Sequence, residues 1–544
     1  IRYSSRPPRG IIYDKNGTPL TSNTALFNLL GFSHQLPSSK EKRLAIYGEL
    51  AGILGEDENK LESEIESQLG QAVILIREDL DKNEVLKIET KKLPGIIIQV
   101  NSKREYVKDP LMSHILGYTG FVSRADLEKD SFYDITDTIG KSGLEQYYEE
   151  YLRGRRGEVV FNKLTQEYEA SQAQSGMNLV LNIDAELQKV LVSSLKSAVR
   201  QAGSKSAAAI IQNPQNGRVL ALVSLPDFDN NIFSSRISQE QYGRLFNNSS
   251  QPLLNRVASG RFHPGSTIKP LMAVAALQEN IISPLKRIFS SGSISLASPF
   301  DSSIVYTFRD WKAHGWVDMR RAIAVSSDVY FYHLGGGYED VRGLGIDRMA
   351  EYMIKFLADK KLGIDLPVET AGFVPSKEWK LKTKNEPWYT GDSYNVSIGQ
   401  GDLIVTPLWL NSYISAIANG GTIYKPQIVD KILDNNKNAV TIFKSEKLTE
   451  NLGDKNNIEI AREGMKLAVE DGTAQILKGL PAKAAAKTGT AEVVKGKSTN
   501  AWFTSFAPYD NPEISITVLI EAGADGSNLP SQVAFNVLQY YFNK

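Results

Sequence analysis

The chain has 544 residues, more than one compact domain usually holds, and this length predicts two to four domains. Lys plus Arg and Asp plus Glu both number 62, so the formal net charge is zero, which argues against a nucleic-acid-binding protein. With 42% hydrophobic and 23% charged residues, the composition is typical of a globular protein and excludes wholesale disorder.

The chain starts at Ile1 instead of Met, continues with a polar stretch, and holds no run of 18 apolar residues. We therefore expect that a signal or membrane anchor originally preceded Ile1. The first predicted element is a strand at residues 9–13, which a tight turn at Asn16-Gly17 ends.

The pattern changes from Ser38 onward. Ser38 and Glu41 have the spacing of a capping box, and apolar residues at helical spacing follow in two segments, 44–54 and 61–69. Short β-branched runs at residues 72–76 and 96–100 flank a third, charged helix. We interpret residues 38–105 as a small α/β module inserted in an extended N-terminal region.

The second part of the chain has predicted strands near both of its ends and helices in the middle. The predicted strands cover residues 178–182, 207–212, 218–224, 501–506 and 514–520. Asp184 is placed to cap a helix over residues 187–199, and another amphipathic helix covers 532–542. This order predicts an α+β domain with one antiparallel sheet flanked by helices.

The segment with the strongest chemical signal is 263–270 (HPGSTIKP). Pro264 and Gly265 predict a turn, and a buried helix follows. Proline is tolerated only in a first helical turn, so Pro270 places the start of that helix near Ser266. Lys269 then lies over the same helix face as Ser266. A neutral, desolvated lysine amine is a base that can activate a serine hydroxyl.

The Ser-x-x-Lys spacing alone is weak evidence, because it recurs three times in this chain. The other pairs are Ser39/Lys42, Ser193/Lys196 and Ser283/Lys286. We interpret these three as ordinary helices with solvated lysines. Ser266 differs because a Pro-Gly turn precedes it and a buried helix follows it.

Two further motifs follow in the chain. Ser326-Ser327-Asp328 lies between two helical stretches, and the strand-like segment 487–490 reads Lys-Thr-Gly-Thr. Ser-x-x-Lys, Ser-x-Asp/Asn and Lys-Thr-Gly, in this order, are typical of penicillin-recognising serine enzymes. No cysteine is present and the five histidines are isolated, so a thiol nucleophile and a histidine-based metalloenzyme are not favoured.

Two other segments imitate these motifs. Lys141-Ser142-Gly143 fits the third motif but precedes the nucleophile and enters a predicted helix. Ser393-Tyr394-Asn395 carries the commoner asparagine of the second motif. We prefer Ser326, because it lies between two helical stretches and 60 residues after Ser266.

Over nearly its whole length the chain resembles the class B penicillin-binding proteins, and most closely their elongation-type subfamily. Besides the three motifs, the resemblance rests on residues 9–17 (RGIIYDKNG), 140–145 (GKSGLE), 309–311 (RDW), 387–389 (PWY) and 399–401 (GQG). Asp328 is typical of the elongation type, because division-type relatives usually carry asparagine there.

This resemblance implies a domain organisation. Residues 1–175 would form a non-catalytic N-terminal pedestal that carries the module at 38–105. Residues 176–544 would form the transpeptidase domain, with an antiparallel five-stranded sheet flanked by helices and a helix-rich subdomain. The resemblance also implies an N-terminal transmembrane anchor in the inner membrane, with the catalytic domain in the periplasm.

The resemblance further implies peptidoglycan D,D-transpeptidation during cell elongation. Ser266 would attack the penultimate D-Ala carbonyl of a stem peptide, with Lys269 as base and Ser326 as a relay to the leaving amine. β-Lactam antibiotics would acylate the same serine. Lys487, Thr488, Gly489 and Thr490 would receive the substrate carboxylate, and the backbone N–H groups of Ser266 and Thr490 would form the oxyanion hole.

Asp328 poses a problem for this chemistry, because a carboxylate near Lys269 would favour the charged lysine. We therefore expect Asp328 to direct its charge mainly at Lys487 or at a backbone donor. On this hypothesis it pairs with a lysine and holds the loop of the second motif in place.

Metals and partners follow from the resemblance as well. Some family members bind zinc through Asp, His and Cys; Asp310 and His314 lie in the matching region, but Ser327 stands at the cysteine position. Because a hydroxyl is a poor zinc ligand, we expect a hydrogen-bonded loop and neither a metal nor a cofactor. The implied partners are a glycosyltransferase of the shape–elongation–division–sporulation (SEDS) type and other elongation-complex proteins, and no nucleic acid.

Two alternatives stay open from the residues alone. One is a class D-like β-lactamase or β-lactam sensor with the same motifs, against which the long N-terminal region argues. The other is a catalytically silent cell-wall scaffold, against which the intact Ser266, Lys269 and Lys487 argue.

Overall fold

The computed structural model describes residues 2–5, 7–71, 73–108, 112–134, 137–162, 167–234, 237–298, 300–494, 498–523 and 528–544. Contacts between residues divide the chain into two compact units. Unit 1 comprises Ile1–Ile11, Leu20–Tyr106 and Glu150–Met177, and unit 2 comprises Ile12–Pro19, Val107–Glu149 and Asn178–Lys544. Across the described ranges, no helix is long and apolar enough to cross a bilayer.

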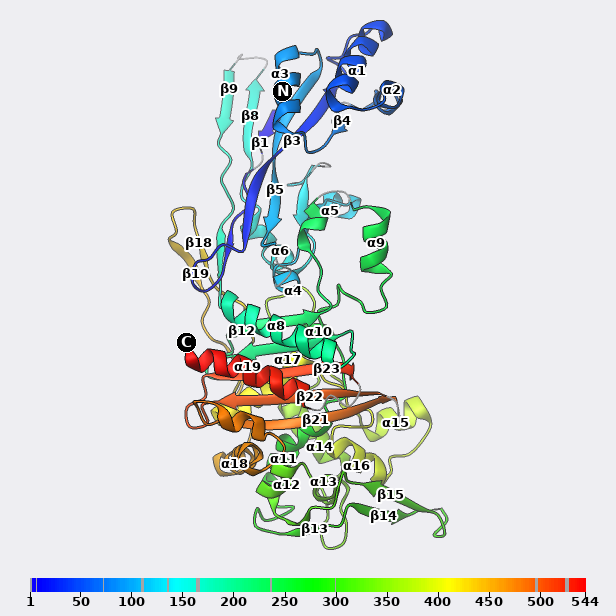
Figure 1. The fold of residues 1–544 in the computed structure, drawn as a ribbon, viewed down its shortest axis with the longest axis vertical. Coiled ribbons are helices and arrows are strands. Elements are labelled where there is room, and N and C mark those ends of the chain that lie inside the picture. The colour runs from blue at the N-terminus through cyan, green and yellow to red at the C-terminus, as the bar shows by residue number, and fades with distance from the viewer. Residues whose placement is uncertain are drawn as a thin grey trace. The chain divides into compact units, whose positions relative to one another are not determined.

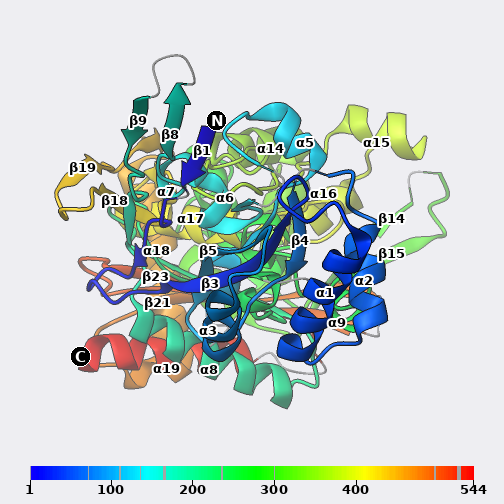
Figure 2. The ribbon, with the colours of Figure 1, turned by 90° about the horizontal axis from the view of Figure 1, so that it is seen from above.

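Unit 1 contains a three-stranded antiparallel sheet covered by three helices (Figure 2). The middle strand, β3 (Thr21–Phe32), pairs with β4 (Val73–Arg77) on one side and β5 (Ile96–Tyr106) on the other. The helices are α1 (Lys40–Leu54), α2 (Glu58–Glu66) and α3 (Lys82–Lys91).

The elements predicted for the inserted module are present, with two differences. The N-cap of α1 is Ser39, so the capping box predicted at Ser38 and Glu41 is wrong; α3 has such a box, at Asp81 and Glu84. The middle strand β3 precedes residue 38, so the sheet draws on chain outside the predicted range. Ala72, the first residue of one predicted strand, lies outside the described residues.

A second antiparallel sheet of unit 1 joins the start of its chain to its end. Its strand order is β1-β8-β9. The bounds are β1 (Arg2–Ser5), β8 (Gly157–Asn162) and β9 (Glu167–Ser171), and the short helix α7 spans Glu149–Leu152.

The centre of unit 2 is an antiparallel five-stranded sheet of order β12-β11-β23-β22-β21, which confirms the predicted α+β fold (Figure 1). Its strands are β11 (Ala207–Gln212), β12 (Val219–Leu225), β21 (Ala485–Val494), β22 (Ser498–Ala507) and β23 (Ile514–Gly523). Strands β11, β22 and β23 are almost continuously buried, as expected of apolar strands covered on both faces.

Helices cover both faces of this sheet. On one face lie α8 (Ala185–Gln201), capped by Asp184 as predicted, and α19 (Leu529–Asn543) (Figure 1). Helix α17 (Pro407–Asn419) packs on the other face, and α18 (Lys455–Asp471) packs against β21.

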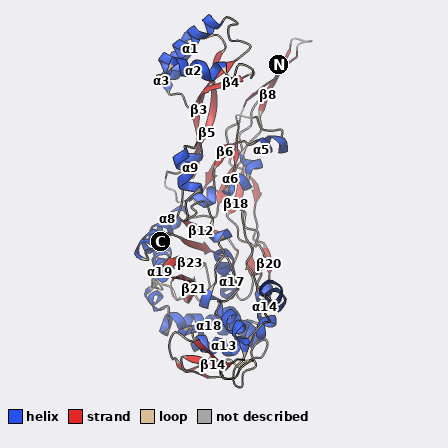
Figure 3. Cartoon of the chain, turned by 90° about the vertical axis from the view of Figure 1, so that its right-hand side faces the viewer, coloured by secondary structure: helices blue, strands red, loops and turns tan. Residues whose placement is uncertain are grey.

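Next to α17 and α18 lies the predicted helix-rich subdomain, with two small antiparallel strand pairs (Figure 3). Its helices are α11 (Lys269–Gln278), α12 (Met319–Val325), α13 (Asp328–Gly336), α14 (Gly345–Lys355), α15 (Lys377–Lys384) and α16 (Thr390–Ser397). The hairpin is β14 (Ser293–Ala297) with β15 (Val305–Arg309), and the strands that flank it in the chain, β13 (Ile288–Ser290) and β16 (Gly315–Val317), form the other pair.

The remaining elements of unit 2 are short. A four-stranded sheet has the order β19-β18-β10-β2, and two further strand pairs are β6–β7 and β17–β20. The strand bounds are β2 (Ile12–Tyr13), β6 (Thr119–Phe121), β7 (Thr138–Gly140), β10 (Asn178–Leu181), β17 (Ile423–Tyr424), β18 (Val429–Leu433), β19 (Ala439–Ile442) and β20 (Lys447–Thr449). The helix bounds are α4 (Ser113–Leu116), α5 (Arg124–Lys129), α6 (Gly143–Tyr147), α9 (Gln239–Phe246) and α10 (Arg256–Ser259).

Candidate active site

Ser266 lies in a 3₁₀ turn, Gly265–Ile268, that leads directly into α11. Pro270 occupies the first turn of α11, as predicted, and the helix is buried along nearly its whole length. Gly265 has φ +55°, and a Cβ there would lie 2.5 Å from the carbonyl oxygen of Thr490. Only glycine permits this backbone approach, which places Ser266 beside strand β21.

Strand β21 carries the third motif and is the last strand of the five-stranded sheet. A Cβ at Gly489 would lie 2.7 Å from Cγ2 of Thr267, so the strand also needs a glycine where it passes the 3₁₀ turn. Lys487 is fully buried, and Thr488 donates from Oγ1 to Oγ1 of Thr473 at 2.9 Å.

Ser326 forms the junction between α12 and α13, as the sequence predicts. Its φ is +58°, a left-handed conformation that non-glycine residues adopt at a cost of about 1–2 kcal/mol. Such backbone strain often occurs at functional sites. The residues that follow, Ser327 and Asp328, start α13.

These three segments meet at the hydroxyl of Ser326. Lys487 donates from Nζ to Ser326 Oγ at 2.8 Å, and Lys269 donates to the same oxygen at 3.3 Å. Lys269 also donates to the carbonyl oxygen of Ser326 at 2.8 Å and to Oδ1 of Asp328 at 2.6 Å. The structure therefore joins two buried lysines through one serine hydroxyl.

The ion pair of Asp328 confirms that it pairs with a lysine, but the partner is Lys269, which corrects the expectation that it faces mainly Lys487. Lys487 is the other lysine at the Ser326 hydroxyl. Its pKa lies well below the ordinary value, because burial and the charge of Lys269 both lower it, whereas Asp328 acts in the opposite direction.

A cleft of about 640 Å³ opens above these side chains. Six predicted site residues line it, namely Ser266, Ser326, Asp328, Thr488, Gly489 and Thr490, while Lys269 and Lys487 lie buried beside it. Seven lining residues had no assigned role: Trp311, Ile398, Gln400, Thr473, Thr499, Ala501 and Asn528. Trp311 and Gln400 belong to segments that carried the family resemblance, whereas Thr473 lies in a segment without any sequence signal.

The competing motifs lie elsewhere. The hydroxyl of Ser393 accepts a hydrogen bond from Trp388 Nε1 at 2.9 Å, and Lys196 pairs with Asp227 at 2.8 Å. Lys286 is paired with Asp340, and Ser142 is the N-cap of α6. The structure thus brings Ser326 to the buried lysines of the cleft, and the other candidates do not line it.

Asp310 and His314 lie next to the second motif, with His314 Nε2 3.4 Å from Asp310 Oδ1. The rest of the donor set does not fit zinc, because Ser327 Oγ donates to Asp310 Oδ2 at 2.8 Å and brings no thiolate. Within the described part of the chain, no three His, Cys, Asp or Glu side chains are grouped to hold a metal ion.

Comparisons with known proteins agree with this geometry. Residues 207–539 match the penicillin binding protein transpeptidase domain, and residues 4–181 match the penicillin-binding protein dimerisation domain. The peptidoglycan D,D-transpeptidase MrdA of Haemophilus influenzae is 33% identical, over 99% of this chain and 84% of that protein. MrdA of Escherichia coli K12 is 30% identical, over 96% of this chain and 84% of that protein.

Solved structures show the same similarity. Penicillin-binding protein PBP2 of Helicobacter pylori, in a complex with MreC, superposes with a TM-score of 0.82 at 28% identity and covers 98% of both chains. PBP2 of Pseudomonas aeruginosa, in complex with WCK 5153, has a TM-score of 0.74 at 28% identity, over all of this chain and 97% of that chain. The chain therefore belongs to the penicillin-binding protein transpeptidase family, in its elongation-type PBP2 branch, and its activity is that of a serine-type peptidoglycan D,D-transpeptidase.

Proposed function

We propose that Ser266 is the acylated nucleophile of this transpeptidase and that Lys269, Ser326 and Lys487 move its protons. The observation that carries the proposal is the Ser326 hydroxyl, which contacts both buried lysines in the cleft that Ser266 lines. Attack of Ser266 Oγ on the penultimate D-Ala carbonyl forms an ester, and the peptide bond to the terminal D-Ala breaks.

The first half-reaction needs a neutral amine at Lys269, which in the structure is paired with Asp328. The contacts between Lys269, Ser326 and Lys487 give a proton a route from one lysine to the other through the shared hydroxyl. The lowered pKa of Lys487 leaves this amine neutral, and the substrate carboxylate bound beside it raises that pKa so that the amine can take the proton from Lys269. The neutral Lys269 then takes the proton of Ser266, and Ser326 delivers a proton to the departing D-Ala amine.

The second half-reaction reverses these transfers. An acceptor amine from a neighbouring stem peptide attacks the ester, loses its proton to the same relay, and leaves Ser266 as the hydroxyl. Backbone N–H groups of Ser266 and Thr490 would stabilise the oxyanion in both steps, each by about 3–4 kcal/mol.

The terminal carboxylate of the substrate belongs, on this proposal, beside Lys487, Thr488 and Thr490. A carboxylate there stabilises the charged form of Lys487 after it has accepted the relay proton. Because β21 ends the sheet, an extended peptide can bind along this strand.

The test is a two-product assay with a synthetic stem pentapeptide and an excess of an acceptor amine. The wild-type protein should release D-Ala and form the new amide, and Ser266→Ala should do neither. Ser283→Ala is the matched control, because it alters a Ser-x-x-Lys pair outside the cleft lining and should retain both products. D-Ala release by Ser266→Ala would overturn the proposal.

We also propose that the region before residue 176 is a non-catalytic pedestal that docks partner proteins, among them a SEDS-type glycosyltransferase. Its match to a dimerisation domain and the H. pylori PBP2 structure with MreC support a docking role. Leu86 (66%) and Val100 (64%) are the most exposed large apolar side chains in the described part of unit 1, and they suit such a contact.

Charge substitutions at these two exposed residues test the docking role. Leu86→Asp with Val100→Asp should reduce co-purification of the full-length protein with its glycosyltransferase. Val440→Asp with Ile442→Asp changes two exposed apolar residues of unit 2 (52% and 62%) and should leave co-purification unchanged. Equal recovery of the partner by both double variants would favour a plain spacer.

The location implied by the family completes the proposal: a single-pass N-terminal anchor in the inner membrane and a catalytic domain in the periplasm. Fractionation of cells that produce the full-length protein should recover it with inner membranes, and external protease should degrade it in spheroplasts. Recovery in the soluble fraction would contradict this location.

A further inference from the structure

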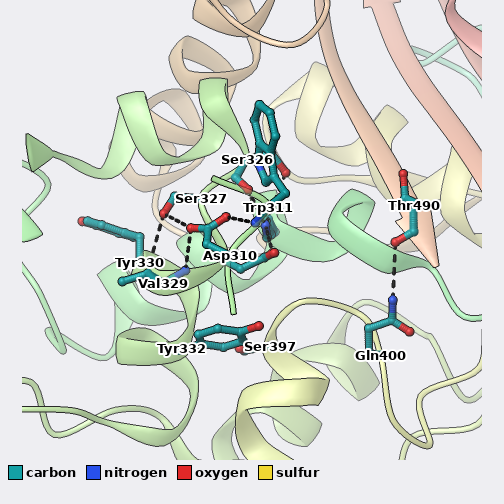
Figure 4. A network of polar contacts seen from close by, with 12 residues as sticks. Asp310, Trp311, Ser326, Ser327, Val329, Tyr330, Tyr332, Ser397, Gln400 and Thr490 are labelled. Carbon is teal, nitrogen blue, oxygen red and sulfur yellow. Dashed lines mark hydrogen bonds and ion pairs between the residues drawn. The ribbon is translucent and has the colours of Figure 1, made fainter. Parts of the chain in front are cut away.

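Asp310 is a buried carboxylate that contacts the second motif but does not line the cleft (Figure 4). Its Oδ2 accepts hydrogen bonds from Ser327 Oγ at 2.8 Å, from the backbone N–H of Val329 at 3.0 Å and from Ser290 Oγ at 3.2 Å. Its Oδ1 accepts from the backbone N–H of Trp311 at 2.9 Å. The ends of two strands and the start of α13 are thus hydrogen-bonded to the side chain of Asp310.

These contacts keep Asp310 ionised. Burial alone would raise the pKa of Asp310, but the adjacent His314 ring, the hydrogen bond from the Val329 N–H and the charge of Lys269 lower it to about 2. A carboxylate at the N-terminus of α13 also interacts favourably with the helix dipole.

The segment that Asp310 holds is the strained turn at Ser326. On the α12 side the turn is fixed by backbone hydrogen bonds from Ser326 N–H to Ile323 and from Ser327 N–H to Ala322. On the α13 side, Ser327 Oγ accepts from the N–H of Tyr330 at 3.3 Å and donates to Asp310. A left-handed serine persists only where its surroundings enforce it, and Asp310 supplies the contacts on the α13 side.

We propose that Asp310 is a positioning residue of the transpeptidase: with Ser290 and Ser327, and without a metal, it fixes the turn that holds Ser326 Oγ between Lys269 and Lys487. These side chains do not fit zinc, and on this proposal the hydrogen bonds from the Ser290 and Ser327 hydroxyls to the Asp310 carboxylate orient the turn in place of a metal. Asp310 acts through the backbone of residues 326–329 and touches no substrate atom.

The test measures acylation by a chromogenic β-lactam and separates the non-covalent binding constant from the acylation rate constant. Asp310→Asn places an N–H₂ group or a neutral oxygen where Oδ2 accepts three donors. Because a displacement of about 1 Å at a reacting group can cost about a hundredfold in rate, the acylation rate constant should fall at least about tenfold. The non-covalent constant should change less than about threefold, since the cleft lining is retained.

Asp365→Asn is the matched control. Asp365 is also a buried carboxylate, but its hydrogen-bond donors are the backbone N–H groups of Ile428 and Val429 and the hydroxyl of Tyr148, none of which belongs to the second motif. Both variants should lower the melting temperature, and only Asp310→Asn should slow acylation. Equal acylation rates in the two variants would overturn the proposal.

Two milder variants keep the test decisive if Asp310→Asn does not fold. Ser290→Ala removes the 3.2 Å donor and Ser327→Ala removes the 2.8 Å donor, so the acylation rate should fall in both and further in Ser327→Ala. Wild-type rates in both would overturn the proposal. Metal analysis of the purified wild-type protein should find no zinc and no effect of chelation; stoichiometric zinc whose removal slows acylation would also overturn it.

Discussion

The ion pair between Lys269 and Asp328 makes the substitution Asp328→Asn especially informative. The two side chains lie 2.6 Å apart, with Lys269 fully buried and the Asp328 side chain 18% exposed. The amide keeps an acceptor in place but removes the charge. The hydrogen bond from the lysine ammonium stays charge-assisted, but the buried cation loses its counter-ion, so stability should fall by about 1–3 kcal/mol.

The same substitution should move the pH dependence of acylation. Asp328 is the one neighbour that raises the pKa of Lys487, against burial and Lys269, which lower it. Its removal should lower the pKa of Lys487 further, so the acid limb of the acylation profile should move to lower pH. At the plateau the rate should stay within about tenfold of the wild-type rate.

Second-order acylation rate constants of the wild type and Asp328→Asn, measured from pH 5 to 9, test this prediction. Asp392→Asn is the control. Asp392 pairs with the buried Lys380, also at 2.6 Å, outside the residues that line the cleft. This control should lose similar stability and leave the pH profile in place. An unmoved acid limb in Asp328→Asn, with the rate down about a thousandfold at every pH, would refute the reasoning and give Asp328 a direct chemical role.

Two further predictions follow from the buried lysine and the close backbone contact. The pKa of Lys487 is lower in the folded than in the unfolded state, so the unfolded chain binds more protons between the two values and stability should rise with pH across that window. The melting temperature of the wild type, relative to that of Lys487→Met, should therefore be higher at pH 9.5 than at pH 7. A difference between the two proteins that does not change with pH would contradict the lowered pKa of Lys487. Gly265→Ala should destabilise unit 2 by at least about 1–2 kcal/mol from its φ alone and should slow acylation, because the new Cβ displaces Thr490; unchanged melting and acylation would contradict the close contact.

The catalytic motifs were predictable because each depends on residues that are close together in the sequence. Pro264, Gly265 and Pro270 fix where the turn before α11 must lie, and the helical stretches around Ser326 mark its junction. The partner of Asp328 was not predictable in this way. Whether Asp328 reaches Lys269 or Lys487 depends on how α11, α13 and β21 pack. The spacing of these residues along the chain does not determine that packing.

The same distinction applies to the fold. The hairpin β11–β12 has a local turn and was predicted, whereas the pairing of β11 with β23 joins residues about three hundred positions apart. Strand β3 is polar in its first half and apolar in its second, so it carries no clear alternation, and its place between β4 and β5 comes from tertiary pairing. Thr473 reaches the cleft for the same reason, through its contact with Thr488.

The most direct test of the account is the site of covalent modification by a β-lactam. The full-length protein is incubated with benzylpenicillin, and intact-mass and peptide mass spectrometry are compared for wild type, Ser266→Ala and Ser283→Ala. We predict one stoichiometric and slowly hydrolysed adduct on Ser266 in wild type and in Ser283→Ala, and none in Ser266→Ala. A stoichiometric adduct on the Ser266→Ala protein, or rapid turnover of penicillin without a lasting adduct, would contradict the assignment of Ser266 as the nucleophile of a transpeptidase.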